Sequence, residues 1–304
     1  ILKGNMISKN SLFFLKKFVR NLYFLMFLNG FLLASLFYFK MEATYERGLF
    51  ASIKSSIDNG LDSDDNQDSI VVKAMATCHD LMINRAPIFE GSHLLGPRSD
   101  FFHGTSVDLM TTQGACGSYA QVMAMILKTY DYPVRIAQMK AGGVWAAHNI
   151  VEVKTHHGWV VLDPTFNVHW VRPDGKLASF DDVHKDWNYY SRQVPSNYDM
   201  IYRFDDVRYS NWTKIPIVMP AIKGILNMII GKAKADTISM RTWFLQIFSI
   251  YFYVALLLYL PVFLFTIRRL IQTKVFPNPD IPLTFRNFIK YMGRVQRQST
   301  EFTR

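Results

Sequence analysis

Two long apolar runs without a charged residue dominate the hydrophobic pattern of the chain, at 21–39 and 243–267. At about 1.5 Å per helical residue, each run is long enough to cross about 30 Å of hydrocarbon. The first run ends in Phe37, Tyr38 and Phe39 rather than in a small-residue cleavage site, which favours an uncleaved anchor over a signal peptide. We therefore expect transmembrane helices at 21–39 and 243–267, the second containing Pro261, which membrane helices tolerate.

A shorter apolar stretch at 215–232 is interrupted by Lys223, Asn227 and two prolines. A third span here would place the two ends of the chain on opposite sides of the membrane. We favour a helix that lies on the membrane surface or packs under the preceding domain.

Between the spans, residues 41–214 alternate between helical and strand periodicity, which is typical of an α+β domain. Apolar residues at helical spacing predict helices at 42–58, 67–86 and 117–130, and a short helix at 180–187. Alternating patterns predict strands at 134–139, 149–153 and 158–162, the last two forming a hairpin around His156 and His157. Residues 92–115 are punctuated by Gly and Ser and predict a long loop.

Charge adds a topology to this pattern. The net charge of +10 is concentrated at the ends: residues 1–20 carry +5 and residues 268–304 carry +6, while 41–240 carry −3. Basic flanks prefer the cytoplasmic side, so both tails are expected in the cytoplasm and the 41–214 domain outside the cytoplasmic (inner) membrane, in the periplasm. The basic tails then serve retention and contact with membrane lipids. No nucleic-acid partner is expected.

Three dispersed residues within the 41–214 domain suggest thiol chemistry. Cys116 opens a predicted helix, where the helix dipole favours the thiolate form. His148 stands at the start of one hairpin strand and Asp163 at the end of the next, so the hairpin can bring them together. A histidine activates a cysteine nucleophile, and a carboxylate on the other imidazole nitrogen orients that histidine.

The sequence around these residues, Gly114-Ala-Cys-Gly-Ser-Tyr-Ala and then His148-Asn-Ile-Val-Glu-Val followed by Leu162-Asp-Pro-Thr, resembles the transglutaminase-like superfamily. The resemblance implies a papain-like core with Cys116 as nucleophile, His148 as base and acid, and Asp163 as the residue that orients it. It also implies acyl transfer through a thioester, with no metal or other cofactor. Many members carry an aromatic residue after the histidine, where this chain has Asn149.

The expected substrates are amide bonds in peptides, proteins or envelope polymers, and hydrolysis is favoured over cross-linking. The backbone N–H of Cys116 is one expected oxyanion donor. Gln113 is a further candidate, although a loop-capping role is the plainer interpretation. The alternative from another class is a non-catalytic binding or assembly module that docks a membrane-complex partner or an envelope polymer.

The other cysteine and the remaining histidines carry less weight. Cys78 lies on an apolar helical stripe and is expected to be a buried hydrophobic residue, with a Cys78–Cys116 disulfide as the alternative. The other histidines have no zinc-like spacing, so we expect no metal site.

Overall fold

The computed structural model describes residues 21–62, 65–89, 96 and 102–272. The chain divides into two compact units, one formed by residues 41–250 and the other by 1–40 together with 251–304. The predictions for the basic tails at 1–20 and 273–304, and for much of the loop at 92–115, concern residues outside the described part.

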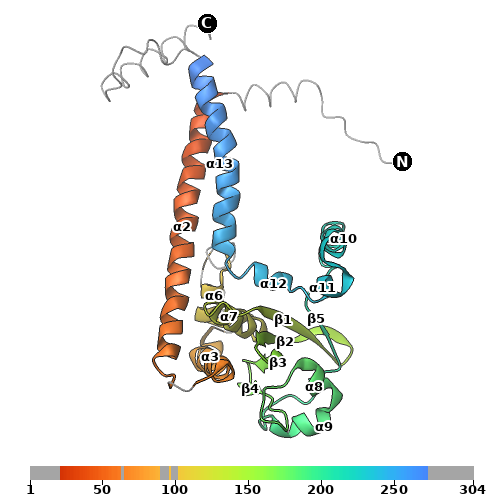
Figure 1. The fold of residues 1–304 in the computed structure, drawn as a ribbon. Helices are drawn as coiled ribbons and strands as arrows, with labels where there is room; N and C mark the ends of the chain where they lie inside the picture. Colours follow the sequence, from red (N-terminus) through yellow and green to blue (C-terminus); the bar gives the residue numbers. More distant parts are fainter. Residues whose placement is uncertain (1–20, 63–64, 90–95, 97–101, 273–304) are drawn as a thin grey trace. The chain divides into compact units, whose positions relative to one another are not determined.

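The smaller unit is a pair of antiparallel helices formed by the first part of α2 (Leu22–Asp58) and most of α13 (Ile247–Gln272) (Figure 1). Asn29 Nδ2 donates to Thr266 Oγ1 at 2.7 Å, and the rings of Phe39 and Tyr251 lie 5.3 Å apart. The first contact joins the start of α2 to the end of α13, and the second joins the middle of α2 to the start of α13, as in an antiparallel pair. Both helices are long and apolar enough to cross a membrane, and most of their apolar surface is exposed.

Helix α2 is continuous, whereas the sequence predicted a membrane helix at 21–39 and a separate helix at 42–58. No helix-breaking Pro or Gly stands between residues 39 and 42, so the backbone hydrogen bonds continue across the change from apolar to mixed composition. The part of α2 from Met41 onward belongs to the larger unit.

The larger unit contains the remaining helices and a five-stranded sheet. The elements before and within the sheet are α3 (Gln67–Met82), α4 (Ala86–Phe89), α6 (Thr105–Thr111), α7 (Cys116–Lys128), β1 (Val134–Ala141), β2 (Val144–Thr155), β3 (Gly158–Asp163) and β4 (Val168–His169). They are followed by α8 (Phe180–Lys185), α9 (Trp187–Tyr190), the 3-10 turn Ser191–Gln193, β5 (Asp206–Arg208), α10 (Val218–Ile230), α11 (Lys232–Asp236) and α12 (Met240–Trp243).

The sheet has the strand order β4-β3-β2-β1-β5, with antiparallel pairing throughout. Strands β2 and β3 form the predicted hairpin, in which Thr155 pairs with Gly158. Strand β2 begins at Val144 rather than near residue 149, because it also forms a hairpin with β1 that the sequence analysis did not foresee.

Two apolar clusters hold the sheet, one on each face. Helices α2, α3 and α7 contribute side chains such as Phe50, Met75 and Val122 to a cluster that includes Ile136 and Val151 of the sheet. The other cluster is centred on the fully buried Trp170 and Phe204 and includes residues of α8 and α9, as well as Met139, Ile150 and Val161 of the strands. Because both faces are covered, consecutive residues in the middle of β1, β2 and β3 are buried, polar ones such as His148 and Glu152 included.

The described part of 92–115 contains helix α6, where the sequence predicted a loop. The helix is rich in Thr, Ser and Asp, residues that are typical of loops. In this helix they are buried, and its first turn bonds to distant parts of the chain: Glu46 Oε1 accepts the backbone N–H of Ser106 at 2.9 Å, and Thr105 Oγ1 donates to the Leu245 carbonyl at 2.7 Å. Burial raises the pKa of Glu46, and the hydrogen bonds from Ser106 and Thr105 oppose that effect.

Helix α10 lies inside the apolar stretch predicted at 215–232 and has no buried residue, and both Met228 and Ile229 are exposed. With 13 residues, it spans about 20 Å at about 1.5 Å per residue, which is too short to cross a bilayer. Its Lys223 pairs with Asp236 of α11 at 2.7 Å.

Candidate functional site

Cys116 is the first residue of α7 and is half-buried. Ala115, the residue before it, has φ 45° and ψ −127°, a backbone conformation that non-glycine residues rarely adopt. The backbone N–H of Cys116 makes no hydrogen bond within the described part of the chain. The sulfur therefore lies at the positive end of the helix dipole, beside an N–H that remains free to bind an oxyanion.

His148 and Asp163 are in direct contact, as the sequence predicted for a hairpin. The Nε2 of His148 lies 2.6 Å from Asp163 Oδ2, and both side chains are almost completely buried. Asp163 Oδ1 also accepts the N–H of Thr165 at 3.1 Å, which fixes the carboxylate. This contact occupies Nε2 and leaves Nδ1 of the imidazole for Cys116.

A register shift in the β1–β2 hairpin sets the position of His148. Met139 pairs with His148, but the next residue, Lys140, pairs with Trp145. The residues skipped on β2 include Ala146, whose φ is 61°. Bulges of this kind re-aim side chains next to active sites. His148 and its neighbour Asn149 both pair regularly with β1 just after this shift, and both interact with Cys116.

The electrostatics of the pair favour charge separation. Burial raises the pKa of Cys116, but hydrogen bonds to His148 and Asn149 and the charge of His148 outweigh it, so the pKa of this thiol is lower than usual. Burial lowers the pKa of His148, but Asp163 and Cys116 together raise it to about 9. Both shifts therefore favour a thiolate–imidazolium pair over the neutral thiol and imidazole.

Aromatic rings cover the imidazole. Tyr202 stacks on His148 with ring centroids 4.4 Å apart, and Phe166 lies 5.7 Å away. Tyr202 comes from a segment that the sequence analysis did not connect with the site. The rings limit contact of the histidine with water and strengthen its interaction with Asp163.

Asn149 and Arg241 are two further polar residues at the site. Asn149 Nδ2 donates to Cys116 Sγ at 3.3 Å, and Arg241 Nη1 donates to Asn149 Oδ1 at 2.8 Å. The only sequence signal for Asn149 was its place after the histidine, where many members of the superfamily that the sequence resembles carry an aromatic residue. No pattern in the sequence indicated Arg241, which comes from α12.

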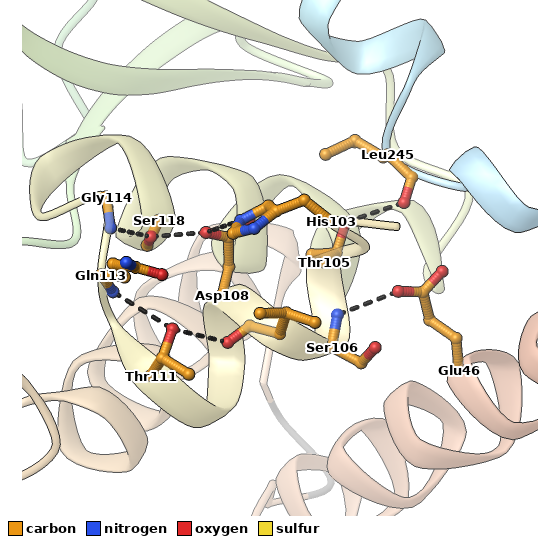
Figure 2. Close-up of polar contacts among 11 residues, drawn as sticks. Glu46, His103, Thr105, Ser106, Asp108, Thr111, Gln113, Gly114, Ser118 and Leu245 are labelled. Carbon is orange, nitrogen blue, oxygen red and sulfur yellow. Dashed lines mark hydrogen bonds and ion pairs between the residues drawn. The ribbon is translucent and has the colours of Figure 1, made fainter. Parts of the chain in front are cut away.

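A buried polar network holds the turn that leads into Cys116 (Figure 2). Ser118 Oγ donates to Asp108 Oδ1 at 2.5 Å and accepts the Gly114 N–H at 2.8 Å. His103 Nε2 lies 3.0 Å from the same carboxylate oxygen of Asp108. A Cβ at Gly114 would lie 2.7 Å from Ser118 Oγ, so only glycine fits this turn without displacing the network.

Gln113 lies in the same turn and is exposed. Its backbone N–H donates to Thr111 Oγ1 at 3.3 Å. Gln113 stays a prediction as an oxyanion donor, while Asn149 is the side-chain donor in contact with the sulfur.

The two cysteines are both free, so the alternative of a disulfide between Cys78 and Cys116 is wrong. Cys78 is fully buried in the cluster between α3 and α7, as predicted for a hydrophobic residue. Within the described ranges, no group of three or more His, Cys, Asp or Glu residues is placed to hold a metal ion.

The part of the chain that contains this cysteine, histidine and aspartate is similar to a known protein family. Residues 97–164 match the model of the transglutaminase-like superfamily. The matched range contains Cys116, His148 and Asp163, and the match supports a papain-like cysteine enzyme or a related module. No curated protein and no solved structure matches the chain significantly. Asn149 lies inside the matched range and Arg241 outside it.

Proposed function

We propose that this chain is a thiol enzyme that cleaves amide bonds by acyl transfer through a thioester on Cys116. The observation that carries the proposal is the buried His148–Asp163 contact of 2.6 Å beside a cysteine whose pKa is lowered by that same histidine. A histidine that only fills space in a core is not expected to contact both a buried carboxylate and a thiol.

The reaction begins when the Cys116 thiolate attacks the carbonyl carbon of the substrate. A C–S bond forms and the carbonyl electron pair moves to oxygen, where the Cys116 N–H receives the negative charge. The intermediate collapses, the C–N bond breaks, and imidazolium His148 gives its proton to the departing amine. His148 then takes a proton from water, whose oxygen attacks the thioester and releases the acid and the thiolate.

We further propose that the enzyme is anchored in the cytoplasmic membrane by α2 and α13 and works on its outer side, on a peptide, protein or envelope polymer. The antiparallel contacts between these helices are consistent with both basic tails lying on one side. The exposed apolar side chains of α10, together with that of Ile217 just before the helix, can insert into the lipid surface. A membrane-complex partner stays an expectation.

The test of the chemistry is a burst assay on the detergent-solubilised full chain with p-nitrophenyl acetate. We expect a rapid release of p-nitrophenolate of about one equivalent, and an acetyl group on the Cys116 peptide by mass spectrometry. Cys116→Ser and His148→Ala are expected to abolish the burst, whereas Cys78→Ala is the matched control and retains it. A folded protein without acetylation at Cys116 would contradict the proposal and favour the binding-module alternative.

The test of the topology uses spheroplasts and a membrane-impermeant maleimide. We expect labelling at Cys116 without permeabilisation, and a protein that stays in the membrane pellet after alkaline extraction. Labelling only after permeabilisation would reverse the proposed orientation. Extraction into the supernatant would contradict the anchor.

A further inference from the structure

Asn149 lies between the nucleophile and a guanidinium group. Its side chain is 6% exposed, its Nδ2 faces Cys116 Sγ, and its Oδ1 faces Arg241 Nη1. A guanidinium can only donate hydrogen bonds, so the carboxamide atom that faces Arg241 must be the oxygen. The orientation of the amide is thereby fixed, and its N–H₂ group must point at the sulfur.

We propose that Asn149 stabilises the Cys116 thiolate and then the oxyanion of the tetrahedral intermediate, and that Arg241 is the positioning residue that keeps the Asn149 donor turned toward the sulfur. This inference rests on the proposed function and adds two residues to it. Asn149 contacts a reacting atom, whereas Arg241 acts through Asn149.

The geometry suits both stages of the reaction. In the free enzyme, the Nδ2–H bond points at Sγ from 3.3 Å, a normal distance for a donor to sulfur. When Sγ bonds to the carbonyl carbon, the carbonyl electron pair moves to an oxygen one bond from that carbon. A donor already in contact with Sγ lies beside this oxygen, together with the free N–H of Cys116. The collapse of the intermediate returns the electron pair and expels the amine protonated by His148.

Other charged and titratable groups also surround the sulfur. His148 of β2 interacts with the sulfur and is itself bonded to Asp163. Tyr202, which stacks on the imidazole, also interacts with the sulfur. Arg241 interacts by charge with Arg208 of β5, with Asp108 of α6 and with Cys116. Burial lowers the pKa of Arg241, but a guanidinium remains charged at neutral pH, and a thiolate at Cys116 favours that charge.

The backbone that carries Arg241 is fixed to the core of the domain. Ser239 Oγ accepts the Ile136 N–H at 3.2 Å and donates to the Ile136 carbonyl at 3.1 Å. Lys128 Nζ of α7 donates to the Thr242 carbonyl at 2.9 Å. Helix α12 is therefore joined both to β1 and to the helix that begins at Cys116, which keeps Arg241 at a constant distance from Asn149.

The experiment measures the rate of iodoacetamide alkylation of Cys116 against pH in the detergent-solubilised full chain, with the modified peptide identified by mass. The variants are Asn149→Ala, Arg241→Met, the double variant and Arg241→Lys. Arg208→Met is the matched control, because Arg208 is a neighbouring cation that bonds Gln138 instead of Asn149. Circular dichroism and a thermal unfolding midpoint confirm that each variant is folded.

We expect Asn149→Ala and Arg241→Met each to raise the thiol pKa by about one unit, which makes alkylation about tenfold slower at pH values below the thiol pKa. The double variant is expected to shift the pKa by much less than the sum of the single ones, because Arg241 acts mainly through Asn149 and its direct charge interaction with the thiolate is the smaller effect. Arg241→Lys retains a donor for Oδ1 and is expected to recover most of the shift. Arg208→Met is expected to change the rate less than twofold.

The outcomes separate this proposal from the function on which it rests. A low thiol pKa in the wild type that neither variant changes would overturn the role of Asn149 and Arg241 and leave the proposed enzyme intact. Additive shifts in the double variant would overturn the positioning role of Arg241. A wild-type thiol pKa of about 8.5, the value of a free cysteine, would overturn the proposed enzyme and this proposal with it.

Discussion

Cys78, which packs against α7 from α3, and Cys116, the first residue of α7, lie in opposite chemical surroundings. Cys78 is fully buried, and its Sγ lies 3.7 Å from the Tyr119 carbonyl of α7 and 3.9 Å from Met82 Sδ. Burial alone raises the pKa of this thiol far above its usual range. Cys116 begins α7, and the histidine and asparagine beside it lower its pKa in spite of its burial.

The comparison shows that burial does not by itself decide whether a cysteine reacts. An apolar environment excludes the thiolate, whereas a partly buried site with a cation and an N–H donor stabilises it. Helix α7 therefore packs against an inert thiol, Cys78 of α3, and carries at its own N-terminus the thiol whose pKa is lowered. Four predictions test this difference.

The largest effect is expected from His148→Ala, which removes the cation and makes the two cysteines more alike. We expect the pKa of Cys116 to rise by about one to two units, so that alkylation at pH 6 slows about tenfold to a hundredfold. The measurement is the pH profile of iodoacetamide alkylation by peptide mass. An unchanged profile would mean that the helix terminus and Asn149 alone set the thiol pKa.

The second prediction concerns pH in the wild type. Acyl transfer needs the Cys116 thiolate and the His148 imidazolium together. Activity is therefore expected to rise as pH passes the lowered thiol pKa and to fall as pH passes about 9, the raised pKa of His148. The measurement is the rate of p-nitroaniline release from an acyl p-nitroanilide from pH 4 to 10, corrected for spontaneous hydrolysis, because this amine needs a proton to leave whereas p-nitrophenolate does not. Alkylation needs only the thiolate, so its rate should show no fall near the upper limit.

The third prediction tests the turn before Cys116. Gly114→Ala is expected to push Ser118 away from Asp108, to lower the free energy of unfolding by about 1–3 kcal/mol and to slow the burst about tenfold. The matched control is Gly117→Ala, where the nearest atom to an added Cβ is Asn149 Nδ2 at 4.0 Å. Denaturant unfolding and burst kinetics measure both effects. Equal behaviour of the two variants would exclude a special role for the Ser118–Asp108 network.

The smallest effect is expected from Cys78→Ala. The change leaves a small cavity between α3 and α7 and is expected to cost about 1 kcal/mol of folding free energy. The alkylation profile of Cys116 should not move, because Cys78 has no part in the ion pair. A shift of that profile would show that packing in the middle of α7 controls its N-terminus.

Local pattern was enough to predict much of this domain. The strands β2 and β3, the start of α7 at Cys116 and the meeting of His148 with Asp163 follow from alternation, helix periodicity and hairpin geometry. Helix α6 escaped prediction because its polar residues bond to Glu46 and Leu245, which lie far away in sequence. A buried polar helix has the composition of a loop.

The remaining site residues depend on the tertiary structure. The irregular pairing around Ala146 gives no distinct signal in a run of small residues. Arg241 reaches Asn149 from a position 92 residues later in the chain. Nothing in its flanking sequence distinguishes it from an arginine that precedes a membrane segment. Contacts of this kind follow from the packing of α12 on β1, which periodicity does not encode.

The edges of the sheet have a consequence for the protein at high local concentration. The outermost strands are β4, with two residues, and β5, with three. Long open edges recruit neighbouring chains into intermolecular sheets, and very short ones offer too few free backbone groups to do so. Strand β2, which carries His148, is paired on both sides, and β3 is paired with β4 at Leu162 and Asp163. The strand positions that carry His148 and Asp163 are thus closed to pairing with another chain.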